Sequence, residues 1–241
     1  NSDFSPQKIK IQNPGEIHHL KNVLRMVKGD HLELFNGQGD EVTGMVESIS
    51  AMEVIVRITE RHPTKINALS VVLACAVPKK AKFEMIVEKC TELGVDEIIP
   101  IRTARTEVIW KEEKGQRKSL RYQTIAVNAS KQSARTTVPV VQEQKAFADV
   151  VAGLDEKTLG LIPCLSGNRK LLKDVCIGIK PFSRILILIG PEGDFTPQEL
   201  ETALKKGFVP VSLGETTLKV DTAAIASVAF IRQMLFSSGV G

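Results

Sequence analysis

From Leu69 onward, continuous apolar runs alternate with segments of helical spacing, and this pattern limits the fold more than any other feature of the chain. The run LSVVLACAV is typical of a strand that is buried on both faces of a parallel sheet. The segment KFEMIVEKCTELG then places its apolar residues on one helical face and ends at Gly94. Because TLGLIPC, RILILIG and FVPVSLG continue as strands with helical segments between them, the sequence predicts an α/β domain.

The first part of the chain has a different pattern. DHLELFNGQGDEVTGMVESIS alternates apolar and polar residues and breaks at Asn36-Gly37 and Gln38-Gly39, which predicts a β-hairpin. EVIVRITERH is a further strand, and EIHHLKNVLRMVKGD has the spacing of a short helix. We therefore expect a small β-barrel-like domain at residues 1–66, a linker in HPTKINA, and the α/β domain at residues 67–241.

Composition argues against a membrane span, disulfides and a metal site. The net charge is +4, and no apolar run is long enough to cross a bilayer. The four cysteines stand far apart, so we expect reduced core residues rather than disulfides or a metal site. All four histidines lie within the first 62 residues, which argues against a zinc site and requires catalysis in the α/β domain to proceed without imidazole.

Basic residues are concentrated in one segment. Between Arg102 and Arg135 there are nine Lys and Arg residues against three Glu. Such a segment is either a solvated helical face or a surface for the phosphate backbone of a nucleic acid, and charge alone does not separate the two.

The glycine turn in RILILIGPEGDFTPQELETALKKGF is the strongest candidate for a binding site. It is not a dinucleotide site, because the first strand of the domain runs into PKKAK without a glycine. P-loop and α/β-hydrolase patterns are also absent. A second glycine turn, VSLGETTLK, follows the next strand and precedes the final helix. Together the two turns predict a crevice lined by main-chain groups, which suits a compact ligand such as an adenine nucleoside.

These segments resemble a known family. LILIGPEGDFTPQELETALKKGFVPVSLGETTLKVDTAAIA is similar to the carboxyl-terminal signature of the RsmE family, the 16S ribosomal RNA (uracil-N3) methyltransferases of the SPOUT superfamily. KCTELGVDEIIPIRTARTEV and KQSARTTVPVV resemble two further motifs of that family, and HHLKNVLRMVKGDHLELFNGQGDEV resembles its PUA-like RNA-binding domain. The resemblance implies a trefoil knot in the second domain, S-adenosylmethionine as methyl donor, no metal, ribosomal RNA as substrate, and a homodimer.

The resemblance also assigns residues. Cofactor binding falls on the first loop, at Leu188, Ile189, Gly190, Glu192 and Gly193, and on the second, at Leu213, Gly214, Leu218 and Lys219. RNA contacts fall on Arg25, Arg105 and Arg135. The chain departs from the family pattern at Thr216 and Lys219, where arginine is usual, at Asp221, where glutamate is usual, and at Lys131, where glutamate is common. These departures bear on substrate contacts, since lysine does not replace the planar fork of arginine.

Methylation of uracil N3 requires removal of its proton and stabilisation of charge on O2 and O4. We predict that Arg135, from its own chain or a partner subunit, steadies the uracil oxygens. Glu192 is a candidate base, with a structural role in its own turn as the alternative.

Other functions are compatible with the sequence. One alternative is a SPOUT methyltransferase that acts on another RNA site or on a ribose 2′-OH. A second is a non-catalytic RNA-binding factor in ribosome assembly. A bacterial protein of this kind is expected in the cytoplasm, and a processed organellar form in a chloroplast or a mitochondrial matrix.

Overall fold

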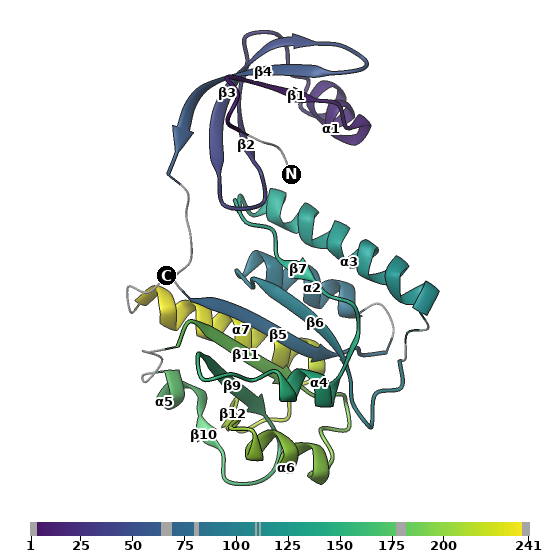
Figure 1. Ribbon diagram of the computed structural model, residues 1–241, viewed down its shortest axis with the longest axis vertical. Helices are drawn as coiled ribbons and strands as arrows, with labels where there is room; N and C mark the ends of the chain where they lie inside the picture. The colour runs from purple at the N-terminus through teal and green to yellow at the C-terminus, as the bar shows by residue number, and fades with distance from the viewer. Residues whose placement is uncertain are drawn as a thin grey trace. The chain divides into compact units, whose positions relative to one another are not determined.

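A computed structural model describes residues 4–63, 69–79, 82–108, 110, 112–176 and 182–237. The chain divides into two compact units, residues 1–66 and 67–241. Most of the predicted linker lies outside the described residues. Figure 1 shows the helices and strands of both units.

The first unit is built on a four-stranded antiparallel sheet in the order β1-β4-β3-β2. Its elements are β1 (Lys8–Ile11), α1 (Pro14–His18), the single π-turn η1 (His19–Val23), β2 (His31–Phe35), β3 (Glu41–Ile49) and β4 (Val54–His62). The predicted short helix is confirmed as α1 and η1, and the predicted hairpin as β2 and β3.

Local signals explain where α1 begins. The Asn13 side chain accepts hydrogen bonds from the backbone N–H groups of Gly15 (2.9 Å) and Glu16 (3.3 Å), and Pro14 occupies the first helical position. Ile17 and Leu20 then pack against Val46 and Val56 of the sheet. The unit therefore has a small core between the helical segment and one face of the sheet.

The second unit has a larger sheet in which the pairings are parallel, in the order β10-β12-β9-β11-β5-β6-β7, with β8 also paired to β6. Its strands are β5 (Ser70–Ala76), β6 (Glu97–Arg102), β7 (Val140–Val141), β8 (Lys145–Ala146), β9 (Thr158–Pro163), β10 (Lys170–Leu171), β11 (Arg184–Ile189) and β12 (Val209–Ser212). Its helices are α2 (Lys82–Glu92), α3 (Glu112–Gln132), α4 (Phe147–Ala152), α5 (Leu172–Cys176), α6 (Pro197–Lys205) and α7 (Val220–Ser237). The predicted α/β class and mainly parallel sheet are confirmed.

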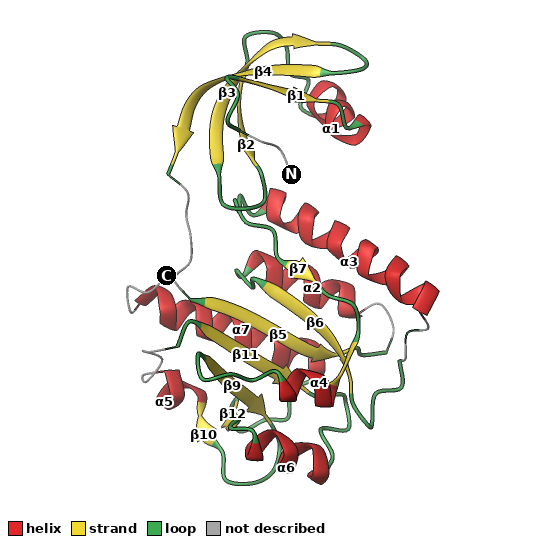
Figure 2. Ribbon diagram, in the orientation of Figure 1, coloured by secondary structure: helices red, strands yellow, loops and turns green. Residues whose placement is uncertain are grey.

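Both faces of this sheet are covered by helices (Figure 2). Residues of α2, α3, α5 and α7 join one apolar cluster, and residues of α4 and α6 join the other. Alternate residues of β11 enter the two clusters: Ile187 and Ile189 face α2 and α7, and Leu186 and Leu188 face α4 and α6. This two-sided burial explains why the strand sequence is apolar throughout.

Candidate functional site

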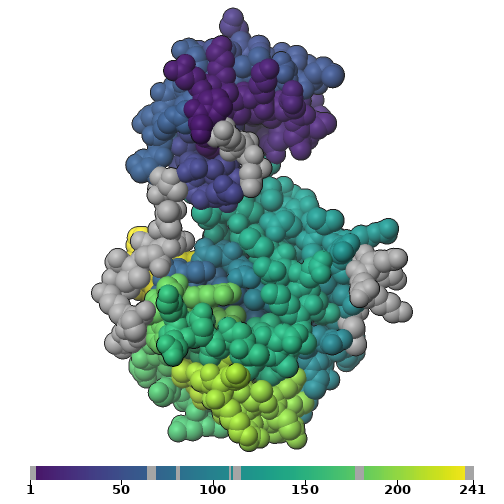
Figure 3. All heavy atoms as spheres, in the orientation of Figure 1, coloured from purple at the N-terminus to yellow at the C-terminus, as the bar shows by residue number. Residues whose placement is uncertain are grey.

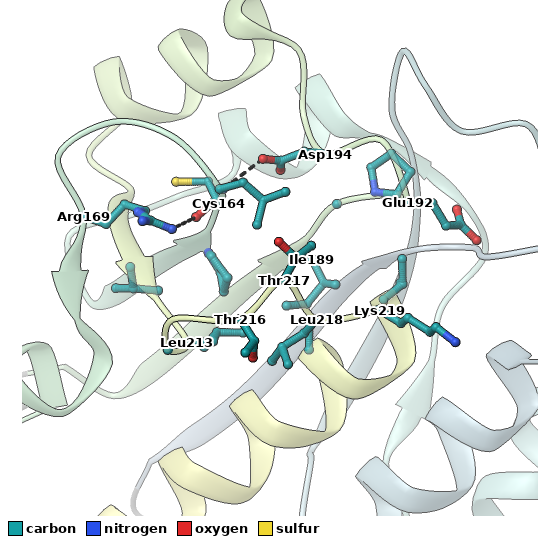
Figure 4. A pocket seen from close by; sticks show the side chains of 18 residues that line it. Cys164, Arg169, Ile189, Glu192, Asp194, Leu213, Thr216, Thr217, Leu218 and Lys219 are labelled. Atoms are coloured by element: carbon teal, nitrogen blue, oxygen red, sulfur yellow. Dashed lines mark hydrogen bonds between the residues drawn. The ribbon is translucent and has the colours of Figure 1, made fainter.

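The candidate site lies where neighbouring parallel strands end at one edge of the second sheet. β9, β11 and β12 pair in the same direction, so Pro163, Ile189 and Ser212 bring three loops to that edge. The three loops and the first turn of α7 enclose a pocket with a volume of about 230 Å³ (Figure 4). Crevices at the carboxyl ends of strands are the usual ligand sites of open α/β sheets.

The first loop is the Gly190–Gly193 turn, and its packing requires glycine. A Cβ added at Gly190 would lie 3.1 Å from the Phe195 ring, so even alanine would crowd this buried aromatic residue. The backbone N–H of Asp194 donates to the carbonyl of Pro191 (2.9 Å) and closes the turn. α6 then begins at Pro197, and Thr196 before it forms a capping box with Glu199.

Two contacts from outside hold this turn in place. The Arg105 guanidinium donates to the carbonyl of Gly193, and a carboxylate oxygen of Glu192 accepts from the backbone N–H of Lys79 (3.4 Å). Arg105 and Glu192 are exposed. In Figure 4 the Glu192 carboxylate points out of the pocket, on the same side as the Lys219 ammonium group.

The second loop, Leu213–Lys219, supplies the opposite wall. Gly214 has φ of 130°, a conformation that other residues rarely adopt, and the Ser212 hydroxyl donates to its carbonyl (3.0 Å). Leu213 and Leu218 present partly buried aliphatic side chains to the pocket, while Lys219 is exposed. Asp221, at the start of α7, pairs with Lys82 of α2 at 3.3 Å. Thr216 and Thr217 of the same loop also line the pocket, so the wall combines aliphatic and hydroxyl side chains and is charged at its rim.

The third wall was not predicted from the sequence. It follows β9 and consists of Pro163, Cys164, Leu165 and Arg169. The Arg169 guanidinium donates to the Cys164 carbonyl (3.0 Å), and the Leu165 N–H donates to Asp194 (2.9 Å), as Figure 4 shows. The strand TLGLIPC could have indicated this wall. In a parallel sheet its carboxyl end lies at the same edge as the ends of the strands that precede the two glycine turns.

Seven of the nine residues that the resemblance assigned to the cofactor line this pocket: Ile189, Gly190, Glu192, Leu213, Gly214, Leu218 and Lys219. Leu188 is fully buried among the residues that face α4 and α6, because its side chain points to the other face of the sheet. Gly193 is not part of the pocket lining; a Cβ added to it would contact Arg105.

Arg135 lies at the other ends of the strands. Its guanidinium donates to the carbonyls of Thr91 (2.6 Å) and Val95 (2.9 Å) and lies 3.7 Å from the Asp96 carboxylate, just before β6 begins. Burial lowers the pKa of Arg135, the Asp96 carboxylate opposes this shift, and the charge of Arg232 adds a smaller lowering. Within one chain, the structure therefore does not bring Arg135 to the pocket, and its guanidinium stabilises the join between α2, β6 and α3.

Arg25 belongs to the first unit. It follows η1 and has a positive φ of 55°, which is uncommon for a residue with a side chain. Its neighbours Val23, Leu24 and Val27 are more than half exposed. Its predicted contact with RNA stays a prediction.

The charged groups of the described part of the chain do not assemble a metal centre. No group of three or more His, Cys, Asp or Glu residues is placed to hold a metal ion among the residues that the structure describes. Among the same residues, no helix has the length and apolar character of a membrane span.

Comparison with known proteins identifies the family. A family model described as an RNA methyltransferase domain matches residues 65–232, and one described as an RNA methyltransferase PUA domain matches residues 11–59. A Synechocystis protein named ribosomal RNA small subunit methyltransferase E is 32% identical over 225 residues, covering 92% of this chain and 72% of the relative. The chain belongs to the ribosomal RNA small subunit methyltransferase E family.

Other relatives agree. The methyltransferase E of Bacillus subtilis is 28% identical over 91% of this chain and 89% of its own. The crystal structure of methyltransferase E from Neisseria gonorrhoeae, bound to S-adenosyl methionine, superposes with a TM-score of 0.84 at 26% identity, covering 95% of this chain and 92% of that one. A Legionella pneumophila protein described as a methyltransferase in complex with the cofactor SAM gives 0.83 at 30% identity, covering 96% and 94%.

Proposed function

We propose that this protein transfers the methyl group of S-adenosylmethionine to N3 of a uridine in small-subunit, 16S-type ribosomal RNA. The observation that carries the proposal is the pocket at the carboxyl ends of β9, β11 and β12, with its two glycine turns and aliphatic walls. The relatives with bound S-adenosylmethionine and the shared family support the cofactor and the substrate class.

The residues present fit this cofactor. Ile189, Leu213 and Leu218 provide apolar surface for a purine ring and for the carbon chain of a methionine group. The turns at Gly190 and Gly214 let main-chain groups approach the hydrogen-bonding edges of a base. The rim at Glu192 and Lys219 is exposed, so a ligand longer than the cavity can extend past it.

Methylation of uracil N3 requires groups at the rim of the pocket that remove a proton and stabilise negative charge. When bound, S-adenosylmethionine supplies a methyl group on a sulfonium centre that reacts with a nucleophile. The N3 proton of uracil lies on the pairing edge, so the target uridine has to be unpaired to reach the site. We propose that Glu192, whose exposed carboxylate lies at the rim, takes the N3 proton, and that Lys219, at the same rim, stabilises negative charge on a uracil oxygen.

The position of Arg135 changes one part of the predicted mechanism. Because its guanidinium is held at the amino ends of β5 and β6, any contact between Arg135 and the uracil would come from a second copy of the chain. A homodimer and a trefoil knot in the second unit remain part of the proposal on the strength of the family resemblance.

The product distinguishes this function from its alternatives. Unmodified small ribosomal subunits are incubated with the protein and labelled S-adenosylmethionine, and the ribosomal RNA is digested to nucleosides. The label is expected in 3-methyluridine. A label in a 2′-O-methylated nucleoside, or in another base, would assign a different methyltransferase activity. Absence of both label and cofactor binding would indicate a non-catalytic assembly factor.

A further inference from the structure

The outer side of α3 is a basic surface. From Gly115 to Gln132 the helix contains four Lys or Arg residues and no Asp or Glu. Its exposed side, here called the α3 face, consists of Arg117, Leu120, Arg121, Thr124, Asn128 and Lys131. These positions recur every three or four residues, so they form one stripe along the helix. At 1.5 Å per residue, the stripe from Arg117 to Lys131 is about 21 Å long.

Within its own unit, the α3 face points away from the apolar core. Tyr122, Ala126 and Ala129 on the opposite side are buried against the core, which fixes the orientation of the helix. Leu120 and the Arg121 side chain are 69% and 67% exposed, respectively. Arg121 pairs with Glu84 of α2 at 2.8 Å, an exposed contact that a stronger anionic partner can replace. Figure 3 shows α3, in teal, at the surface of the second unit.

Topology connects this face to the pocket. β6 runs parallel to β5 and β11, so its last residue, Arg102, lies at the sheet edge that carries the pocket. The loop that follows touches the Gly190–Gly193 turn through Arg105, and α3 then returns toward the amino ends of the strands. A strand of RNA that presents one nucleotide to the pocket can therefore continue along α3.

Charge also points to the second unit. Residues 1–66 contain eight Lys or Arg and nine Asp or Glu, so the PUA-like unit has no net positive charge to attract a polyanion. α6, on the other side of the second sheet, mixes Lys205 with Glu199 and Glu201. The α3 face is thus a basic stripe in the unit that carries the pocket.

We propose that the α3 face binds the phosphate backbone of the RNA that flanks the methylated nucleotide. The inference rests on the proposed function, since it takes RNA as the substrate. Guanidinium groups at Arg117 and Arg121, one turn apart, bind phosphates without reading sequence. Their contribution to affinity is expected to depend on salt rather than on which bases are present.

The test compares two double variants of the full chain that remove the same number of charges. R117Q/R121Q changes the α3 face, and K205Q/K206Q changes α6, where Lys205 pairs with Glu201 as Arg121 pairs with Glu84. All four side chains are exposed, so both variants should fold, which circular dichroism verifies. Affinity for a labelled 20-nucleotide oligouridylate and for protein-free small-subunit ribosomal RNA is measured at several salt concentrations.

R117Q/R121Q is expected to bind both RNAs more weakly than the unchanged protein does. It should also reduce the slope of log affinity against log salt concentration by about two, one for each lost phosphate contact. K205Q/K206Q is expected to match the unchanged protein. Equal slopes for all three proteins would overturn the α3 proposal and would leave this face to a protein partner or to solvent. Methylation of small subunits by the unchanged protein is assayed in parallel, so failure of the proposed function registers separately.

Discussion

The two units show how differently one chain can use a β-sheet. In the first unit the antiparallel sheet buries a small cluster around Val46 and Val56, and its sequence alternates. In the second unit the sheet is parallel and buried on both faces, and its strands are continuously apolar. Parallel strands all end at one edge, so their loops can form a pocket there. The parallel direction of the strands, which their continuous apolar sequence already indicates, therefore places the ligand pocket in the second unit.

The largest expected effect is on the free energy of unfolding, when a core residue is truncated in one unit or in the other. Trp110, the single tryptophan of the chain, lies in the second unit, so its fluorescence reports the unfolding of that unit alone. Ile187→Ala removes a fully buried side chain and should lower the free energy of unfolding by about 2–5 kcal/mol in the tryptophan transition. Val46→Ala should cost about 1.5 kcal/mol and appear only in circular dichroism.

Denaturant titrations with both probes check this. If Val46→Ala shifted the tryptophan midpoint, the two units would unfold together, and their independence would be wrong.

A second prediction concerns the polar cluster at the amino ends of β5 and β6. Asp96 accepts from the backbone N–H of Val71 (2.8 Å) and binds the guanidinium of Arg232 on α7. Asp96→Asn should destabilise the second unit by about 2 kcal/mol, because two partly buried guanidinium groups lose their carboxylate while some solvent still reaches the site. Glu201→Gln, which removes the exposed partner of Lys205, should leave the tryptophan transition unchanged. Equal midpoints for the two variants would rule out a stabilising role for the cluster.

Helix caps offer a smaller and symmetrical comparison. Asn13 caps α1 in the first unit, and Thr196 caps α6 in the second. Replacing either with alanine should cost about 1 kcal/mol, since an orphan backbone N–H loses its acceptor. Thr196→Ala is expected to move the tryptophan transition, and Asn13→Ala only the dichroism signal of the first unit. The reverse assignment would contradict the division of the chain.

The last prediction concerns the reactivity of the cysteine thiols. All four cysteines belong to the second unit and are buried and free. Burial raises the pKa of the Cys90 thiol from about 9 to about 12, and burial, more than the nearby Cys90 and Glu192, raises that of Cys75. At pH 8, a far smaller fraction of Cys90 than of an ordinary thiol is therefore present as thiolate. Iodoacetamide should label these two residues only after the second unit unfolds, as peptide mass mapping would show; rapid labelling of the folded protein would mean that the core opens.

Much of this arrangement could be predicted from the sequence, and the failures have physical causes. The capping box at Thr196 and the glycine turns depend on residues close together in the chain, so local patterns are sufficient to predict them. The face to which Leu188 points could not be predicted, because a strand that is apolar at every position carries no alternation. The wall at Cys164 and Arg169 depends on β9 lying beside β11 and β12, which only the strand order reveals.

Arg135 shows that a sequence motif can also assign a residue to the site wrongly within one chain. A motif assigned it to the substrate, but neighbours distant in sequence, Thr91 and Val95, occupy its guanidinium. Motif position alone does not tell whether an arginine meets a ligand or the backbone carbonyls of its own fold.

The central claim is that the pocket at the carboxyl ends of β9, β11 and β12 holds S-adenosylmethionine. Ala223 lines this pocket from α7, whereas Ala226, one turn further along, is exposed. Calorimetric titration of S-adenosylmethionine should therefore show one site per chain in the unchanged protein and in A226F. In A223F the added ring fills the cavity, and affinity should fall at least about 100-fold, or about 2.7 kcal/mol. Equal binding by A223F and A226F would contradict the account, and so would the absence of binding by the unchanged protein.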